Sequence, residues 1–148
     1  MVGASAELHG WPELSAALDN LTPAIEREVQ QVLDVTGLKL RGDIIKDIQR
    51  SPATGKTYRK YSPNRTHRAS APGEPPASDT GRLANSIVFK SDGRLSVSVG
   101  SDLAYAAYLE FGTSRMAPRP AWTPAVENER KPFYKRLEEA VARGMKNA

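Results

Sequence analysis

Residue types that carry catalysis or bind metals are sparse in this 148-residue chain, and their spacing matches no known site. The chain has no cysteine, and His9 and His67 lie in no metal-ligand or catalytic-triad pattern. Asp43 and Asp47 are four residues apart, a spacing that is typical of a solvated helix side. Glu110 has no neighbour that completes a general-base site. We therefore expect a protein that is not an enzyme and that uses no metal or cofactor.

A phosphate-binding loop is the one catalytic motif that the sequence approaches. Residues 51–57 end in the letters GKT, as that motif does, but Arg50 stands where the motif has its first glycine. Pro52 also removes a backbone amide, and a helix rather than a strand is expected before this segment. We therefore expect no nucleotide site here.

Positive charge is concentrated in one segment. The chain has a net charge of +4, and residues 51–73 hold five Lys/Arg and no Asp/Glu. Tyr58 and Tyr61 are interleaved with these cations, a pattern that occurs where proteins hold single-stranded nucleic acid. Residues 55–68 can face DNA or an acidic partner, or can form an ordinary solvated loop. The cations are Lys56, Arg59, Lys60, Arg65 and Arg68.

A second unusual segment, residues 105–125, is rich in aromatic residues, prolines and arginines. Gly112 permits a sharp turn, and the prolines favour an extended backbone after it. Such a stiff, aromatic, arginine-bearing segment suits contact with another chain better than chemistry. We expect a subunit or partner interface in which Glu110 pairs with an arginine of a neighbour. The expected interface residues are Tyr105, Tyr108, Glu110, Phe111, Arg115, Met116, Arg119 and Trp122.

Apolar spacing predicts the helices that position these segments. Apolar residues recur every three or four positions from Ile25 to Ile48, which predicts a long amphipathic helix over residues 22–50. A shorter helix is expected over residues 12–18, and a helical turn over 82–85. The tail over residues 123–146 is expected to be helical and to be kinked or split at Pro132. The predicted apolar face of the tail helix is Val126, Phe133, Leu137 and Val141.

Between the helices, residues 86–100 predict a β-hairpin that turns around Asp92-Gly93. Residues 51–78 contain five prolines and no apolar periodicity, which predicts a long, basic loop that is weakly ordered in the free subunit. Residues 1–11 are expected to form a loose terminus. The chain is thus predicted to be one α+β domain, 1–148, in which a small antiparallel sheet with this hairpin packs against a long N-terminal helix and a C-terminal helix.

The composition predicts a soluble protein. No apolar run approaches the roughly 20 residues that cross a bilayer, and the N-terminus lacks the pattern of a signal peptide. Hydrophobic residues make up 39% of the chain, a low share that is typical of proteins that bury surface in an assembly or that carry a disordered loop. We expect no membrane partner and synthesis in a cytoplasm.

Three blocks of residues resemble a known family. They read DTGRLANSI at 79–87, VSVGSDLAYAAYLEFGT at 97–113 and MAPRPAWTPA at 116–125. In order and spacing the blocks resemble the small neck or tail-component proteins of long-tailed bacteriophages, called head–tail joining or tail-completion proteins. That family more usually has phenylalanine after the arginine–proline pair, where this chain has Ala121 followed by Trp122.

The resemblance implies a structural component of a phage or prophage virion, present in the neck and, during assembly, in the host cytoplasm. It implies an oligomeric ring, six copies being what related connector rings suggest, with head-connector and tail-tube or tail-terminator proteins as partners. In the expected mechanism the EFGT (110–113) and RMAPRP (115–120) segments dock on the neighbouring subunit, and the basic loop faces the channel for DNA. The alternative is a basic nucleic-acid-binding module that uses residues 55–68.

Overall fold

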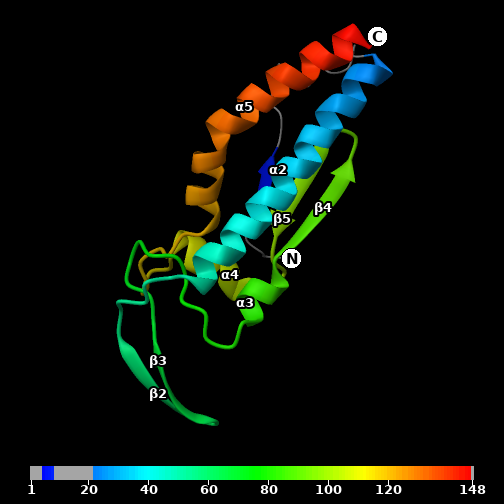
Figure 1. Cartoon of the computed structure of the whole chain (residues 1–148). Coiled ribbons are helices and arrows are strands. Elements are labelled where there is room, and N and C mark those ends of the chain that lie inside the picture. The colour runs from blue at the N-terminus through cyan, green and yellow to red at the C-terminus, as the bar shows by residue number, and fades with distance from the viewer. Residues whose placement is uncertain (1–4, 9–21, 148) are drawn as a thin grey trace.

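The computed structural model describes residues 5–8 and 22–147 and has the predicted α+β class. Figure 1 shows α2 lying over the main sheet with α5 beside it, while one hairpin extends away at the end opposite the C-terminus. No helix in this part of the chain has the length and apolar character that a membrane span requires. In chain order the elements are β1 (Ser5–Leu8), α2 (Pro23–Gln49), β2 (Thr57–Tyr61), β3 (Asn64–Arg68), α3 (Arg82–Ser86), β4 (Val88–Gly93), β5 (Ser96–Gly100), α4 (Ala104–Phe111) and α5 (Trp122–Lys146).

Helix α2 confirms the prediction from apolar spacing. It begins at Pro23, directly after Thr22, and ends at Gln49 before the Ser51-Pro52 pair. Every inward-facing residue that the spacing predicts is buried, and these residues contact α5 on one side and β5 on the other. The buried set is Ile25, Val29, Val32, Leu33, Thr36, Leu40, Ile44 and Ile48.

The main sheet has the strand order β1-β5-β4, and all its pairs are antiparallel. Strand β1 corrects the expectation of a loose terminus at residues 5–8, where Ser5 pairs with Gly100 and Leu8 with Val97; the rest of the 1–11 range lies outside the described residues. The added strand satisfies backbone groups of β5 that an uncovered edge would leave unpaired. The helix predicted over residues 12–18 lies outside the described residues.

The hairpin β4–β5 is confirmed, but its turn lies two residues later than predicted. Strand β4 continues through Gly93, with an irregularity after Ser91, and the turn residues are Arg94 and Leu95. Contacts with α2 explain the shift. The Leu95 backbone N–H donates to Gln30 Oε1 at 2.9 Å, and the Leu95 side chain packs against buried residues of α2.

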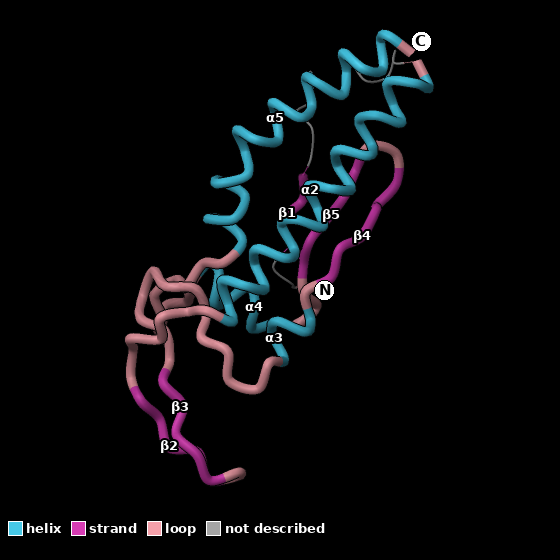
Figure 2. Tube along the Cα trace, viewed as in Figure 1, coloured by secondary structure: helices cyan, strands magenta, loops and turns pink. Residues whose placement is uncertain are grey.

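A second hairpin, β2–β3, corrects the prediction of a continuous loop over residues 51–78. Tyr58 pairs with His67 and Lys60 with Arg65, on either side of a turn at Ser62-Pro63. Threonine and tyrosine favour strands, but neither strand has alternating apolar residues, and the cations Arg59 and Lys60 are adjacent, so no period-two pattern marks these strands in the sequence. Figure 2 shows this hairpin standing apart from the main sheet.

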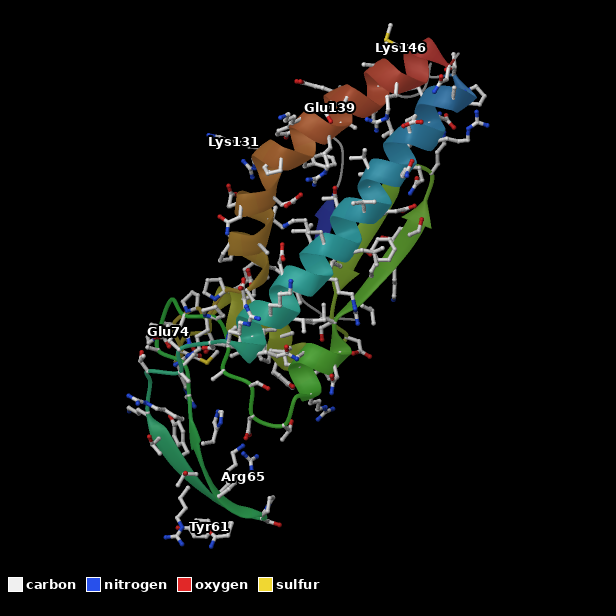
Figure 3. All side chains as sticks on the ribbon, viewed as in Figure 1. Tyr61, Arg65, Glu74, Lys131, Glu139 and Lys146 are labelled. Carbon is white, nitrogen blue, oxygen red and sulfur yellow. The ribbon has the colours of Figure 1, made fainter. Side chains whose placement is uncertain are left out.

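Helix α5 runs unbroken from Trp122 to Lys146 with Pro132 inside it, so the helix is not split. It does change direction near Lys131, as Figure 3 shows, which confirms the predicted kink. Its predicted apolar face packs against clusters of buried residues that include residues of α2 and β5. Near its end, a methyl group added at Gly144 would lie only 2.6 Å from Ile25 Cα, so the backbones of α5 and α2 approach closely.

Candidate functional site

Glu110 is the last buried residue of α4, with an exposed fraction of 5%. Its Oε2 accepts hydrogen bonds from the backbone N–H groups of Ala121 (2.7 Å) and Trp122 (3.0 Å), and its Oε1 accepts from Thr123 N–H (2.7 Å). These amides belong to the first turn of α5, where backbone donors lack helical partners. The expected pairing of Glu110 with an arginine of a neighbour is therefore corrected: Glu110 caps a helix of its own subunit.

Trp122 is also part of the subunit core rather than an exposed anchor. It is 4% exposed, and its indole Nε1–H donates to the Val99 backbone carbonyl at 3.0 Å. This hydrogen bond ties the start of α5 to β5. The sequence alone did not separate Trp122 from the other aromatic residues of the segment, because its partners are distant along the chain.

The turn after α4 has the conformation that the sequence predicts. Gly112 has φ +74°, and a methyl group added there would lie 2.8 Å from the Met116 backbone oxygen, so glycine is required. Thr113 N–H donates to the same Met116 oxygen at 2.8 Å. The turn brings Met116 back toward α4, where its side chain is half-buried.

The RMAPRP segment, expected to be an arm that docks on a neighbour, is fixed to its own subunit. Arg119 N–H donates to the Leu109 carbonyl at 2.6 Å, and Arg119 Nε donates to the Ser70 carbonyl at 3.0 Å. The Gly73 N–H donates to the Pro118 carbonyl at 3.0 Å. Arg119 therefore connects α4 with the loop before α3, and Arg115 is left exposed.

Three large side chains of α4 remain on the surface. Tyr105, Tyr108 and Phe111 are 38%, 51% and 71% exposed, and their three-residue spacing places them along one side of the helix. The opposite side, with Ala106 and Glu110, is buried. We call these three exposed residues the α4 aromatic face.

Asp79 organises the inner side of the β2–β3 hairpin. Its carboxylate pairs with Lys60 and Arg65, and His67 Nδ1 lies 3.5 Å from Asp79 Oδ1. The hydrogen bonds from Arg65 and then Lys60 hold the pKa of Asp79 well below its usual range. Two of the five predicted surface cations are thus used within the subunit, and they anchor the hairpin.

The other three cations, Lys56, Arg59 and Arg68, are exposed. The Arg59 guanidinium lies 5.5 Å from the centre of the Tyr61 ring, a cation–π contact. Figure 3 shows Tyr61 at the far end of the hairpin, and this side chain is 78% exposed. The hairpin thus has an inner side paired with Asp79 and an outer, cationic side.

A pocket of about 720 Å³ lies between this hairpin and α4, and we call it the hairpin–α4 pocket. It brings together residues from both segments that the sequence singled out. Arg82 and Asp79, which sequence reasoning missed as site residues, also line it; their block was noticed only as part of the family resemblance. The lining residues include Lys56, Arg82, Leu83, Tyr105, Leu109, Arg115 and Met116.

An ionic cluster around the buried Glu129 joins α2 and α5, and sequence reasoning missed it as well. Glu129, 4% exposed, pairs with Arg136 and with Lys39 Nζ at 2.9 Å, and Arg136 Nη2 donates to Thr36 Oγ1 at 3.1 Å. Hydrogen bonds to Asp43 and Glu129 raise the pKa of Lys39. Among the residues that the structure describes, no group of three or more His, Cys, Asp or Glu could hold a metal ion. The cluster holds two helices together.

Comparison with known families agrees with the resemblance in the sequence. The chain matches the family model described as "Bacteriophage HK97-gp10, putative tail-component" over residues 13–112. This range includes α2, both hairpins and α4, and it ends before the block at 116–125. No curated protein and no solved structure matches the chain. Because the family match covers more than half of the chain, the protein belongs to the HK97-gp10-like family of bacteriophage tail components.

Proposed function

We propose that this phage tail component is a head–tail joining, or tail-completion, protein that works as a ring in the neck of a long-tailed phage. The observation that carries the proposal is the α4 aromatic face. Tyr105, Tyr108 and Phe111 are large and exposed, and they form a row of three aromatic side chains along one side of a single short helix. Aromatic side chains dominate the energetics of protein interfaces, and such a face is a natural subunit contact.

In this proposal the contact is head-to-tail, because a ring requires two different surfaces on each subunit. The α4 aromatic face, together with exposed Arg115 beside it, is one of these surfaces. Glu110, Trp122 and Arg119 support it from within the subunit, since their partners are internal. We propose six copies, the number that the resemblance suggests, placed between the head connector and the tail tube or its terminator.

The outer side of the β2–β3 hairpin is proposed to face the channel or a partner protein. Arg59 and Arg68 are the cations available there, because Lys60 and Arg65 are paired with Asp79, and Lys56 lines the hairpin–α4 pocket. Contacts of lysine and arginine with DNA phosphates do not read sequence, which suits a channel through which any genome segment passes. The same exposed cations, with Tyr61 at the tip, favour the second candidate function, a nucleic-acid-binding module.

The mass of the purified protein in solution tests the proposal, together with its affinity for duplex DNA at several salt concentrations. The proposal expects ring-sized particles and weak binding to DNA. A protein that stays a monomer at high concentration and with its tail partners present would contradict the ring. Tight binding with a steep salt dependence in such a monomer would favour the nucleic-acid-binding module instead.

A further inference from the structure

The hairpin–α4 pocket carries positive charge that the subunit does not neutralise. Lys56, Arg82 and Arg115 line it, and none of them has an ion-pair partner within residues 5–8 and 22–147. Asp79 is the one carboxylate among the lining residues, and it is already paired with Lys60 and Arg65. The pocket therefore attracts negative charge.

The floor of the same pocket is apolar. Leu83 is buried, and Leu109 and Met116 are half-buried. Tyr105 also lines the pocket and belongs to the α4 aromatic face, so the two surfaces adjoin at this residue. Its volume of about 720 Å³ is within the range of pockets that hold a ligand or a short peptide segment. A ligand that fits it has carboxylates for the cations and an apolar side chain for the floor.

We propose that the hairpin–α4 pocket binds an acidic segment of a neighbouring neck or tail protein, in which aspartate or glutamate residues flank an aromatic or aliphatic anchor. This inference rests on the proposed function only in taking the partner from the virion. The planar guanidinium groups of Arg82 and Arg115 suit two-pronged hydrogen bonds to carboxylates. The apolar anchor would lie against Leu109 and Met116.

A second copy of this chain fits the pocket less well, because several of its carboxylates already form ion pairs within their own subunit. Among the described residues, five acids form ion pairs with bases of their own subunit outside the pocket, and they leave less free negative charge to offer. These acids are Glu26, Glu28, Asp43, Glu127 and Glu129.

Duplex DNA fits the pocket less well for a different reason. Its outer surface presents phosphates and sugars, and it has no side chain that fills an apolar floor. Arg59 and Arg68, which are exposed and do not line the pocket, are better placed to meet a polyanion. The pocket and the outer side of the hairpin are thus two separate charged surfaces.

The test measures binding of short fluorescent peptides to the full-length protein by anisotropy. One peptide alternates glutamate with phenylalanine and leucine; the other has glutamine at each glutamate position. We expect the acidic peptide to bind and the glutamine peptide to bind at least about tenfold more weakly. Replacing Arg82 and Arg115 together by alanine should weaken binding of the acidic peptide by about tenfold or more.

The matched control replaces Arg59 and Arg68 by alanine, which removes the same charge from outside the pocket. We expect this control to change peptide affinity by no more than about twofold, since both charges are exposed and neither lines the pocket. Equal weakening by the two double variants would overturn the proposal, as would equal binding of the two peptides. Met116→Gln, which keeps every charge, should also weaken binding of the acidic peptide. Unchanged binding would contradict the proposal that an apolar anchor lies against Met116.

Two further outcomes would show that the pocket binds something other than an acidic segment of a partner protein. If duplex DNA displaces the peptide and binds through Arg82 and Arg115, the pocket is a DNA site. If Arg82→Ala alone, which leaves the proposed ring surface unchanged, abolishes self-association, a second copy occupies the pocket. Absence of rings in the wild type would overturn the proposed function alone, because peptide binding is measured whatever the oligomeric state.

Discussion

Glu110 and Thr123 join α4 to α5 through a single carboxylate oxygen: Glu110 Oε1 accepts from Thr123 N–H at 2.7 Å and from its hydroxyl at 2.6 Å. Phe111, the most exposed member of the α4 aromatic face, is the next residue along the chain from Glu110. The cap therefore fixes the orientation of that face relative to the subunit core. A proposed interface on a short helix gains rigidity from this link.

Glu110→Gln is expected to lower the free energy of unfolding by about 2 kcal/mol or more, because buried donors lose a charged acceptor. Chemical denaturation followed by circular dichroism measures the change. The control is Glu127→Gln at an exposed acid that pairs with Arg130, and we expect this change to cost at most about 0.5 kcal/mol. Equal effects of the two changes would show that Glu110 does not act as the cap.

Two glycines in helices should respond in opposite ways to alanine. At Gly42 an added methyl group meets nothing within 4 Å, so Gly42→Ala should stabilise the protein by up to about 1 kcal/mol. At Gly144 the methyl group would lie 2.6 Å from Ile25 Cα, so Gly144→Ala should force α5 away from α2 and destabilise the protein. Thermal unfolding of both variants checks the pair. Stabilisation by Gly144→Ala would contradict the close packing of these helices.

The helices were predictable because their information is local. Ile25, Val29 and the later apolar residues of α2 mark the buried face by spacing alone, and Thr22-Pro23 marks its start. The roles of Glu110 and Arg119 were not predictable, because their partners are settled only when α4, α5 and the loop before α3 pack together. In the sequence, an acid among aromatic residues has the same pattern whether it is an interface residue or a helix cap.

The two hairpins show the same limit. Gly93 marks a turn in the sequence, yet contacts of Leu95 with α2 move that turn. In β2–β3 the cations Arg59 and Lys60 are adjacent, so the sequence has no period-two pattern that marks a face. Only Asp79, eleven residues beyond Arg68, reveals which side faces inward. The hairpin–α4 pocket forms from segments that are close only in the folded chain, so neither charge nor apolar spacing predicted it.

Docking of the β2–β3 hairpin should depend on the charge of Asp79. Its pKa in the folded state is lowered, so the ion pairs contribute fully above the unfolded pKa of about 3.9 and are lost as pH falls below it toward the folded pKa. Asp79→Asn should produce the same release at neutral pH. Amide exchange over residues 57–68 measures it, and we expect faster exchange in the variant.

The control for this prediction is Asp92→Asn, which removes an exposed acid on the other hairpin. It should leave exchange over residues 57–68 unchanged. If Asp79→Asn also leaves those amides as they are in the wild type, the ion pairs do not hold the hairpin in place.

The α4 aromatic face should matter for association and not for folding. Replacing Tyr108 and Phe111 together by serine should change the free energy of unfolding by only about 0.5 kcal/mol, because both side chains are exposed. The same variant should be smaller than the wild type in sedimentation velocity. Trp122→Ala is the contrasting change, expected to cost about 3–5 kcal/mol because Trp122 is buried.

Complementation of a phage that lacks this protein tests the central claim most directly. Joined particles are counted against separate heads and tails by electron microscopy, with the wild-type chain, the Tyr108 and Phe111 serine variant, or no chain supplied. We predict joined particles with the wild type, and separate heads and tails with the folded serine variant and with no chain. Heads and tails that join equally well in all three cases would contradict a joining role for this protein.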